Sequence, residues 1–414
     1  MTEVMSAPNT GDITLDLREV KLTSDLHTPD SGINMDSSKC TTPQSPAPQS
    51  TSGPDMVVDA DDIWTCKRDA AVRLRTESSG PLAENPMSVM TVFQRTLKRY
   101  PQQIALGQKV NNDWKTWTYE EYYRDVRQVA RAFIKLGLDE YHGVGIVGFN
   151  SPEWFISDLA AIFAGGFAVG IYTTNSPDAV QYVAHNADCN ILVVENDAQL
   201  QKVLKVRDEL PALKAIIQWN GKPKGNHPDV YSWDQMMKLV SGNELEDVLE
   251  ARIKAQAPNK CCTLIYTSGT TGNPKGVMLS HDNMTWTANV AGQTARLIYG
   301  EEVAISYLPL SHIAAQMLDI YMPLFYGASC YFAQPDALKG SLLNTLKEVR
   351  PTLFFGVPRV WEKFQEGLIK MGRQNTGLKK KVAVWAKGVG LKGNMAIMNG
   401  RASKPFGWSV ANAM

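Results

Sequence analysis

The sequence predicts an α/β protein with a largely parallel sheet. Short apolar runs, typical of buried strands, alternate with stretches of helical spacing over residues 104–218. Helix-start signals such as Ser151-Pro152 stand between these runs, and glycine follows the helical stretch that ends near Gly137. A repeating order of strand and helix favours parallel strands, because parallel neighbours need a long crossover connection.

Length and composition fit a globular protein of several domains. The 414 residues allow roughly two to three domains. Hydrophobic residues make up 44% and charged residues 20% of the chain, which excludes disorder throughout. Lys+Arg and Asp+Glu are both 42, so the net charge is zero. This balance argues against a chain-wide nucleic-acid interface, and we expect no nucleic-acid partner.

The N-terminal segment differs from the rest. Residues 1–62 hold eleven acids and three bases, and residues 31–54 are mainly Ser, Thr, Pro, Gln and Gly without an aromatic residue. Such a segment buries too little apolar area to offset its ordering entropy. We expect residues 1–60 to be a disordered, acidic, Ser/Thr/Pro-rich segment, with folded structure beginning near Ile63.

The first expected elements are a strand pair and a helix. Strands at Ile104–Leu106 and Trp114–Trp117 flank turn residues at 111–113. Thr118 with Glu121 is a capping-box pattern that starts a helix ending at Gly137. A short buried strand follows at 144–149.

Residues Trp154–Tyr172 are apolar for nearly the length of a bilayer. Asp158 lies inside this stretch, and Gly165-Gly166 interrupts it. An acid in mid-span costs about 2.5–3.5 kcal/mol on insertion scales. A buried helix, a glycine turn and a buried strand are therefore expected rather than a membrane span.

The next segments continue the alternation of strand and helix. Ile191–Val194 and Ala215–Gln218 are further short strands, with a polar helix at Ala198–Arg207 between them. The polar stretch Trp233–Lys254 is expected to be helical.

The six cysteines form no Cys-x-x-Cys, and no histidine lies at ligand spacing from another. A structural metal site is not expected. Sparse, unpatterned cysteines and the lack of an apolar signal-peptide core indicate a reducing compartment, which we take to be the cytoplasm.

The most informative stretch runs from Cys261 to His281. An apolar strand, Cys262–Tyr266, leads into a loop of small residues, and the loop closes at Lys275-Gly276 before the apolar run Val277–Leu279. Small residues let the main chain approach a polyphosphate, successive N–H groups can converge on its oxygens, and one lysine adds a compact charge. A flexible linker would rarely stand between two buried apolar runs, so we expect a phosphate-binding loop.

Two nucleotide-binding patterns are excluded. Five residues on from Gly269 stands Pro274, so the Walker spacing fails. Gly143, Gly145 and Gly148 match the dinucleotide fingerprint, but they lie within a strand rather than after one. We interpret this match as chance.

The stretch Tyr266-Thr-Ser-Gly-Thr-Thr-Gly-Asn-Pro-Lys-Gly276 resembles the phosphate-binding loop of the adenylate-forming superfamily. The core motif that follows the loop resembles the next core motif of the same superfamily, and three further segments are similar to the bubblegum branch of long-chain acyl-CoA synthetases. These segments are Gly148–Phe155, Pro335–Leu342 and Gly356–Lys363, and the core motif is Ser306–Gln316. The resemblance covers residue 63 to the C-terminus.

The resemblance implies the large N-terminal domain of the synthetase fold over residues 63–414, with mostly parallel sheets flanked by helices. It implies an ATP-dependent long-chain fatty-acid–CoA ligase, in which a fatty acid first forms an acyl adenylate. Coenzyme A, as co-substrate, then displaces AMP. ATP and Mg²⁺ are the implied cofactors, and a long-chain or very-long-chain fatty acid is the implied substrate.

The site residues follow from the same resemblance. The phosphate contacts are expected from Thr267, Ser268, Gly269, Thr270, Thr271, Gly272, Asn273, Pro274 and Lys275. His312 is expected at the junction of acyl tunnel and reaction centre, with a satisfied core histidine as the alternative. Trp361 and the corner at 356–358 either shape the acyl tunnel or simply pack.

The family's later motifs are not found in the sequence. These are the Tyr-Gly-x-(Thr/Ser)-Glu motif, the ribose-binding Asp and the C-terminal domain with its catalytic Lys. The domain is therefore expected to be incomplete and the chain alone inactive. The alternative function is a truncated, non-catalytic protein that binds nucleotide, lipid or a partner.

The stretch Gly377–Lys392 has five lysines and no acid. One interpretation is a helix at a membrane surface with Trp385 as its anchor, and with peripheral attachment to the endoplasmic reticulum or another membrane. The other is a solvated helix whose apolar side packs on the core, although Gly388 and Gly390 weaken the helical pattern.

Overall fold

The computed structural model describes residues 52–77, 79–80, 83–225, 227–267, 273–374, 376–400 and 405–412. The expected disordered segment therefore lies, up to residue 51, outside the described residues. Contacts among described residues begin before Ile63, because the Val58 N–H donates to Asn259 Oδ1 at 3.1 Å. The chain divides into a larger unit, residues 44–337 with 344–354, and a smaller unit that includes residues 338–343 and 355–414.

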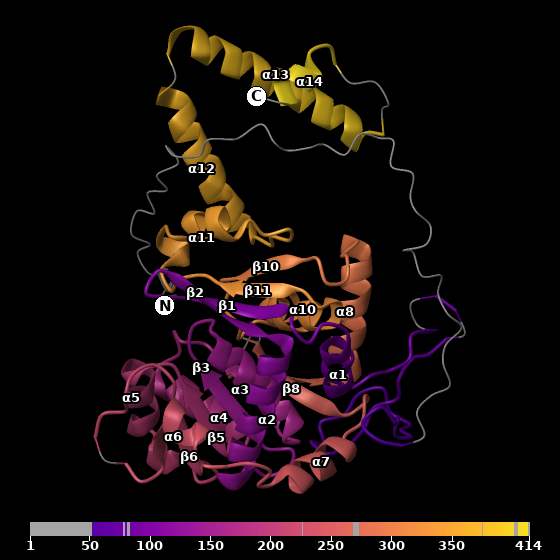
Figure 1. Ribbon diagram of the computed structural model, residues 1–414, viewed down its shortest axis with the longest axis vertical. Coiled ribbons are helices and arrows are strands. Elements are labelled where there is room, and N and C mark those ends of the chain that lie inside the picture. Colours follow the sequence, from indigo (N-terminus) through magenta and orange to yellow (C-terminus); the bar gives the residue numbers. More distant parts are fainter. Residues whose placement is uncertain are drawn as a thin grey trace, which may run out of the picture. The chain divides into compact units, whose positions relative to one another are not determined.

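The larger unit contains two sheets with helices around them (Figure 1). Its helices are α1 (Val89–Arg99), α2 (Tyr119–Lys135), α3 (Pro152–Phe163), α4 (Pro177–Asn186), α5 (Asp197–Lys205), η2 (Arg207–Glu209), α6 (Trp233–Met237), α7 (Glu246–Lys254), α8 (His281–Ala295), α9 (Ile313–Gln316), η3 (Met317–Tyr321), α10 (Met322–Tyr326) and most of α11 (Leu342–Val349). Its strands are β1 (Ile104–Val110), β2 (Asp113–Thr118), β3 (Gly143–Val147), β4 (Phe167–Ile171), β5 (Ile191–Val194), β6 (Ala215–Gln218), β7 (Val230–Ser232), β8 (Cys261–Thr267), β9 (Lys275–Ser280), β10 (Val303–Ser306) and β11 (Ser329–Phe332).

The first sheet has seven strands in the order β7-β6-β5-β3-β4-β8-β9. All neighbours are parallel except β8 and β9, which pair antiparallel at one edge. Alternate residues of β3 and β5 enter two separate core clusters, one on each face of the sheet. The prediction of a largely parallel sheet covered on both faces is confirmed.

The second sheet has four strands in the order β10-β11-β1-β2. β1 and β2 form the expected antiparallel pair, with Val110 opposite Asp113 across the turn. β1 is parallel to β11, so segments more than 200 residues apart meet in one sheet. Helix α3 contacts β1 of this sheet and also β3 and β4 of the first sheet.

The sequence signals at the helix ends are confirmed. Thr118 and Glu121 make both hydrogen bonds of a capping box at the start of α2. Ser151 caps α3, and Pro152 stands at its first turn. Gly137 follows α2 with a φ of +93°, a conformation that glycine adopts without a steric penalty.

The apolar stretch Trp154–Tyr172 is a buried helix, a turn and a buried strand, as expected. Every residue of α3 except Glu153 is buried, Gly165 turns the chain with a φ of +79°, and β4 is buried throughout. Among the described residues, no helix is long and apolar enough to cross a membrane.

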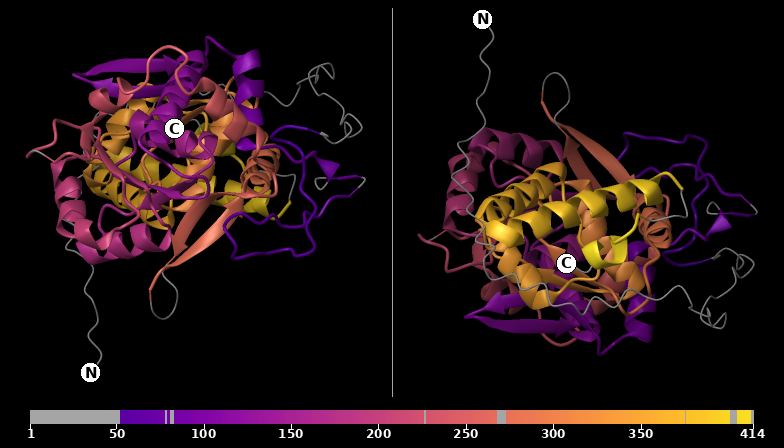
Figure 2. Two further views of the ribbon diagram at one scale, coloured as in Figure 1. Left: turned by 90° about the horizontal axis from the view of Figure 1, so that it is seen from below. Right: turned by 90° about the horizontal axis from the view of Figure 1, so that it is seen from above.

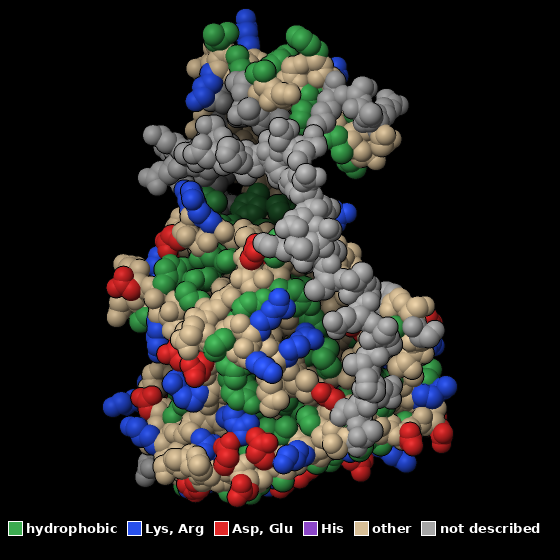
Figure 3. Space-filling view, turned by 45° about the vertical axis from the view of Figure 1, so that its right-hand side comes forward, with side chains coloured by type: hydrophobic (Ala, Val, Ile, Leu, Met, Phe, Trp, Pro, Cys, Tyr) green, Lys and Arg blue, Asp and Glu red, His purple; other side chains and the backbone are tan. Residues whose placement is uncertain are grey.

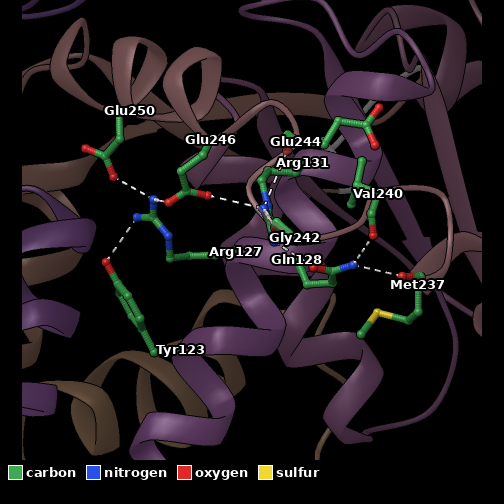
Figure 4. A network of polar contacts seen from close by, with 10 residues as sticks. All are labelled: Tyr123, Arg127, Gln128, Arg131, Met237, Val240, Gly242, Glu244, Glu246 and Glu250. Carbon is green, nitrogen blue, oxygen red and sulfur yellow. Dashed lines mark hydrogen bonds and ion pairs between the residues drawn. The ribbon is translucent and has the colours of Figure 1, made fainter.

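The expected continuous helix at 233–254 is wrong. α6 ends at Met237 and α7 starts at Glu246, and Leu245 just before it has a φ of +61°. The connection is held by α2 (Figure 4). Gln128 Nε2 donates to the carbonyl oxygens of Met237 and Val240, both at 2.8 Å. Main-chain acceptors that a continuous helix would use internally thus bind a neighbouring helix.

Two arginines of α2 complete this network (Figure 4). Arg127 pairs with Glu246 and with Glu250, and Arg131 Nη1 lies 3.4 Å from Glu246 Oε2. The Arg127 side chain is only 14% exposed. The two acids raise its pKa above the ordinary value, although its burial lowers it. These ion pairs therefore hold the start of α7 against α2.

The smaller unit contains three described α-helices and most of the short 3-10 helix η4 (Ala337–Lys339). The α-helices are α12 (Pro358–Gln374), α13 (Gly377–Met398) and α14 (Trp408–Asn412). α13 is continuous through Gly388 and Gly390. Its closest packing is with α14, where a Cβ atom on Gly393 would lie 1.7 Å from Trp408 Cδ1. A glycine is required there because Trp408 occupies the space of a side chain.

Candidate functional site

The expected phosphate loop joins two antiparallel strands, β8 and β9. β8 runs parallel to β4, so it ends at the same edge of the sheet as the other parallel strands. Figure 2 shows β8 and β9 as a long hairpin at the side of the larger unit. In open α/β sheets, ligands bind outside the carboxyl ends of the strands. The loop therefore starts at the edge where a ligand is expected.

The two ends of the loop are fixed by one cross-strand pair, Thr267 opposite Lys275. Thr267, Asn273 and Lys275 are exposed, and Pro274 is half-buried. The remaining predicted contacts, Ser268, Gly269, Thr270, Thr271 and Gly272, lie outside the described residues. Among the residues that are described, Lys275 makes no ion pair, so its charge stands exposed at the end of the loop.

The residue pair next to the loop is tightly packed. Tyr266 lies opposite Gly276, and a Cβ atom on Gly276 would lie 3.0 Å from Tyr266 Cζ. The Tyr266 hydroxyl donates to Asn186 Oδ1 at 2.7 Å, which ties the end of β8 to α4. Burial raises the pKa of Tyr266. The glycine at the end of the motif thus serves strand packing.

The expectation of a buried run after the loop is wrong. β9 is an edge strand, and Val277 is 44% exposed. Edge strands have one hydrogen-bonded neighbour only, so apolar residues on them are less covered.

The second motif, Ser306–Gln316, is held at the same edge of the sheet. A Cβ atom on Gly170, near the end of β4, would lie 2.9 Å from Ser311 Cα. Asn150, in the loop after β3, donates from Nδ2 to Ser306 Oγ at 2.7 Å and to the Leu308 carbonyl oxygen at 2.8 Å. The ends of β3, β4 and β8 and this motif therefore meet in one region.

His312 is exposed, so the alternative of a core histidine is wrong. Its Nδ1 accepts a hydrogen bond from the Ala314 N–H at 3.1 Å, which caps α9. A neutral ring with an accepting Nδ1 carries its proton on Nε2. Among the described residues, no contact joins His312 to Thr267 or Lys275.

Sequence reasoning missed a buried carboxyl behind the motif. Asp319 lies in η3, a π-helical turn, and burial raises its pKa to about 8 although its hydrogen bond with Ser306 lowers it. π-Helical turns are rare overall, but those that do occur are often found at functional sites. The sequence offers one signal, a lone acid in the apolar stretch 317–326.

A second buried carboxyl lies on α3. Tyr321 donates from its hydroxyl to Asp158 Oδ2 at 2.9 Å, and burial raises the pKa of Asp158 to about 7. Asp158 and Asp319 thus favour the protonated form inside the fold.

Trp361 and the corner at 356–358 lie in the smaller unit. Trp361 Nε1 donates to the Gly356 carbonyl oxygen at 2.8 Å, and the side chain is 52% exposed. This hydrogen bond links the first turn of α12 to a residue just before the helix.

The three glycines of the dinucleotide pattern pack against neighbouring side chains, and Gly148 lies directly after β3 rather than within it as expected. Gly143 and Gly145 lie within β3, and a Cβ atom on Gly145 would lie 2.4 Å from Leu192 Cδ2. Gly148 similarly faces Trp219 Cη2, at 2.1 Å from a Cβ atom. These glycines admit large neighbours between strands.

Three further observations concern metal sites, cavities and the charge of the surface. The described residues contain no group of three or more His, Cys, Asp or Glu side chains that could hold a metal ion. A cleft of about 850 Å³ lies between residues 63–75 and the β8–β9 hairpin, outside the Ser306–Gln316 motif. On the face in Figure 3, Lys and Arg side chains of the larger unit are interspersed with Asp and Glu side chains.

The sequence resembles known enzymes over most of its length. The family model described as AMP-binding enzyme matches residues 93–392. The long-chain-fatty-acid–CoA ligase ACSBG2 of Xenopus laevis is 55% identical over 85% of this chain and 48% of its own length. Human ACSBG1, also named a long-chain-fatty-acid–CoA ligase, is 46% identical over 84% of this chain and 48% of its own. The chain spans about half the length of the curated relatives it matches.

Solved structures share the fold. The anthranilate CoA ligase AuaEII, in complex with anthranoyl-AMP, aligns with a TM-score of 0.54 and 22% identity over 65% of this chain and 49% of its own. The A-PCP didomain of the carboxylic acid reductase from Segniliparus rugosus, in complex with AMP, aligns with a TM-score of 0.58 and 18% identity, over 75% and 48%. The predicted fold and the resemblance to bubblegum-type synthetases are confirmed: the chain belongs to the family of AMP-binding enzymes.

Proposed function

We propose that the chain is part of an ATP-dependent long-chain fatty-acid–CoA ligase. In the first step the carboxylate of a fatty acid attacks the α-phosphorus of ATP, giving an acyl adenylate and pyrophosphate. In the second step the thiol of coenzyme A attacks the acyl carbon, and AMP leaves. The similarity to ligases named for this activity, at 44–55% identity, supports the substrate class.

The single observation that carries the proposal is the position of the Tyr266–Gly276 motif. The motif joins β8 to β9 at the carboxyl edge of a parallel sheet, with Thr267 and Lys275 paired at its ends. Prearranged donors and a lysine at such a site neutralise charge that develops on transferring phosphates. We assign the β- and γ-phosphates to residues 267–275, which include Thr267, Asn273, Pro274 and Lys275.

His312 is proposed to border the reacting carboxylate. Its exposed ring carries the Nε2 proton when neutral, and a donor there can orient an acyl oxygen. The cap to Ala314 fixes the ring, so the donor position is set before a substrate arrives.

Mg²⁺ is the proposed metal cofactor, and it would be held largely by the phosphates of ATP. In proteins Mg²⁺ is usually held by one or two carboxylates and by the phosphates of the substrate. When bound, it neutralises phosphate charge.

The cytoplasm is the proposed compartment, since Cys66, Cys189, Cys261, Cys262 and Cys330 are all free thiols. A peripheral membrane contact through residues 377–392 belongs to the same proposal, because a long-chain acid is supplied by lipid surfaces.

The test is fatty-acid-dependent exchange of labelled pyrophosphate into ATP by the purified chain with Mg²⁺. Exchange would support an adenylation site within these residues, against the expectation of an inactive chain. No exchange from a folded chain would favour the non-catalytic alternative. The assigned phosphate-binding residues would then be tested by the same assay in a longer relative.

The residue-level test is Lys275→Ala in whichever protein supports exchange. We expect the rate to fall roughly 10²–10³-fold, the usual effect of removing one electrostatic donor. Lys98→Ala, an exposed lysine on α1, is the matched control and should leave the rate unchanged. An unchanged rate in Lys275→Ala would contradict the assigned role.

A further inference from the structure

A small cavity lies inside the larger unit, among α2, α3, η3, α10 and the strands β1 and β11. Its volume is about 10 Å³, and all the residues that line it are buried. This volume is close to the smallest space that holds one water molecule. Cavities with apolar walls stay empty, so the polar atoms on the wall decide whether this one contains a water.

Two polar side chains on the wall of the cavity lack a partner. The Tyr122 hydroxyl and Asp319 Oδ2 are buried atoms, and neither makes a hydrogen bond within the described part of the chain. Tyr122 is 3% exposed and Asp319 is 8% exposed. A buried polar atom without a hydrogen bond lowers stability, and nearly all such atoms in folded proteins are paired with protein or water.

A third polar side chain on the wall can accept a hydrogen bond. Tyr119 donates its hydroxyl hydrogen to the carbonyl oxygens of Pro323, at 2.9 Å, and Ala328, at 2.7 Å. Its own oxygen keeps lone pairs for a further donor. A buried water typically makes about three hydrogen bonds, so Tyr119, Tyr122 and Asp319 together supply enough partners.

The two oxygens of Asp319 differ in their surroundings. Ser306 makes a side-chain hydrogen bond with Asp319, and this bond involves Oδ1 because Oδ2 has no partner. Asn150 donates to Ser306 Oγ at 2.7 Å, which leaves the serine hydroxyl hydrogen for Oδ1. Burial raises the pKa of Asp319 to about 8, so Oδ2 carries a proton at neutral pH. Protonated or not, Oδ2 needs a partner that the described side chains do not provide.

We infer that this cavity binds one water molecule, which bridges the Tyr122 hydroxyl and Asp319 Oδ2. At neutral pH the water accepts a hydrogen bond from each of these groups and donates one to the Tyr119 oxygen. A metal ion does not fit, because two of the three groups present hydrogens to the cavity. The bridge completes a polar chain from α2 through Asp319 and Ser306 to Asn150, in the loop after β3.

The inference goes beyond the proposed function, since the water needs neither nucleotide nor fatty acid. It is tested by the sign of one substitution, Tyr122→Phe, which removes the hydroxyl and keeps the ring. If the water is present, a hydrogen bond is lost, and the equilibrium constant for unfolding should rise roughly fivefold. If it is absent, a buried group without a partner is removed, and the constant should fall.

Denaturant titration of the full chain measures this constant, and an unchanged or lower value would overturn the inference. A second variant, Asp319→Leu, removes the other end of the bridge. Because both variants lose the same water, Tyr122→Phe should change the constant less than about twofold in the Asp319→Leu background. A full fivefold effect in that background would also contradict the bridge.

The matched control for this pair is Tyr182→Phe, at a half-buried tyrosine of α4 that does not line the cavity. Its effect on the unfolding constant should be the same with Asp319 and with Leu at position 319. A difference between the two backgrounds would show that Asp319→Leu disturbs the fold widely, and the crystal structure would then decide.

A crystal structure of the full chain, at a resolution that shows ordered waters, tests the site directly. We expect one peak of density at about 3 Å from both Tyr122 Oη and Asp319 Oδ2. The same position should be empty in Tyr122→Phe combined with Asp319→Leu. A cavity without density in the unsubstituted chain would overturn the inference.

Discussion

The helices α3 and α13 are both rich in apolar residues, but they are buried to opposite extents. Every residue of α3 except Glu153 is buried, because the helix lies between strands of both sheets. In α13 only Gly393 is buried. The difference is in the polar residues, since α13 carries five lysines and α3 carries none. Apolar content alone thus does not decide burial, and the position of the charges does.

The largest expected effect separates two leucines. Leu159 of α3 is 0% exposed, and Leu391 of α13 is 64% exposed. Leu159→Ala should lower the free energy of unfolding by about 2–5 kcal/mol, because it leaves a cavity in a packed core. Leu391→Ala should lower it by less than about 0.5 kcal/mol. Chemical denaturation of both variants measures the contrast, and equal losses would contradict it.

The second effect is a pH dependence that arises from the buried carboxyls. Burial raises the pKa of Asp158 to about 7 and of Asp319 to about 8, so the protonated forms stabilise the fold. This stabilisation is complete below the unfolded value near 3.8 and is lost as the pH rises through these pKa values. Burial lowers the pKa of His281 to about 3, which gives the opposite slope below 6.5.

Between pH 6.5 and 8 the two carboxyls therefore dominate. We expect the free energy of unfolding to fall by roughly 2–3 kcal/mol over this range. Asp319→Asn should remove most of the fall, while Asp234→Asn, at an exposed acid of α6, should retain it. Denaturation curves at pH 6.5 and at pH 8 measure this fall. A free energy of unfolding that rises with pH over this range would contradict the raised pKa values of the two carboxyls.

The smallest effect compares two helix starts. Thr118 makes the capping hydrogen bond of α2, and Thr376 at the start of α13 makes none. Thr118→Ala should cost about 1 kcal/mol, and Thr376→Ala should cost nearly nothing. Thermal unfolding measures both, and a loss at Thr376 would indicate a contact beyond the described residues.

The sequence predicted those features of the fold that depend on interactions within a few residues. Thr118 with Glu121 and Ser151 with Pro152 fixed two helix starts, because a cap depends on its own turn. The break after Met237 could not be predicted, because Gln128, more than 100 residues away, binds the freed carbonyl oxygens. The pairing of β1 with β11 is non-local for the same reason.

The candidate site was predicted only in part. The motif at 266–276 predicted a loop after the strand that ends near Tyr266, but it did not predict that β9 would pair antiparallel with β8. Asn150 and Asp319 were missed because their roles depend on Ser306, which is distant from Asn150 in sequence. The exposure of β9 was missed because an apolar run does not reveal whether a strand has one neighbour or two.

The β8–β9 hairpin has a kinetic consequence for the loop that it carries. Amide hydrogens of β8 that bond to β4 lie inside the sheet, so their exchange with solvent requires large-scale unfolding. β9 pairs with β8 alone, so it can open by fraying from one side. Thr267 is thus attached to the slowly exchanging strand and Lys275 to the rapidly exchanging one. The Lys275 end of the loop can therefore open while the sheet that contains β8 stays closed.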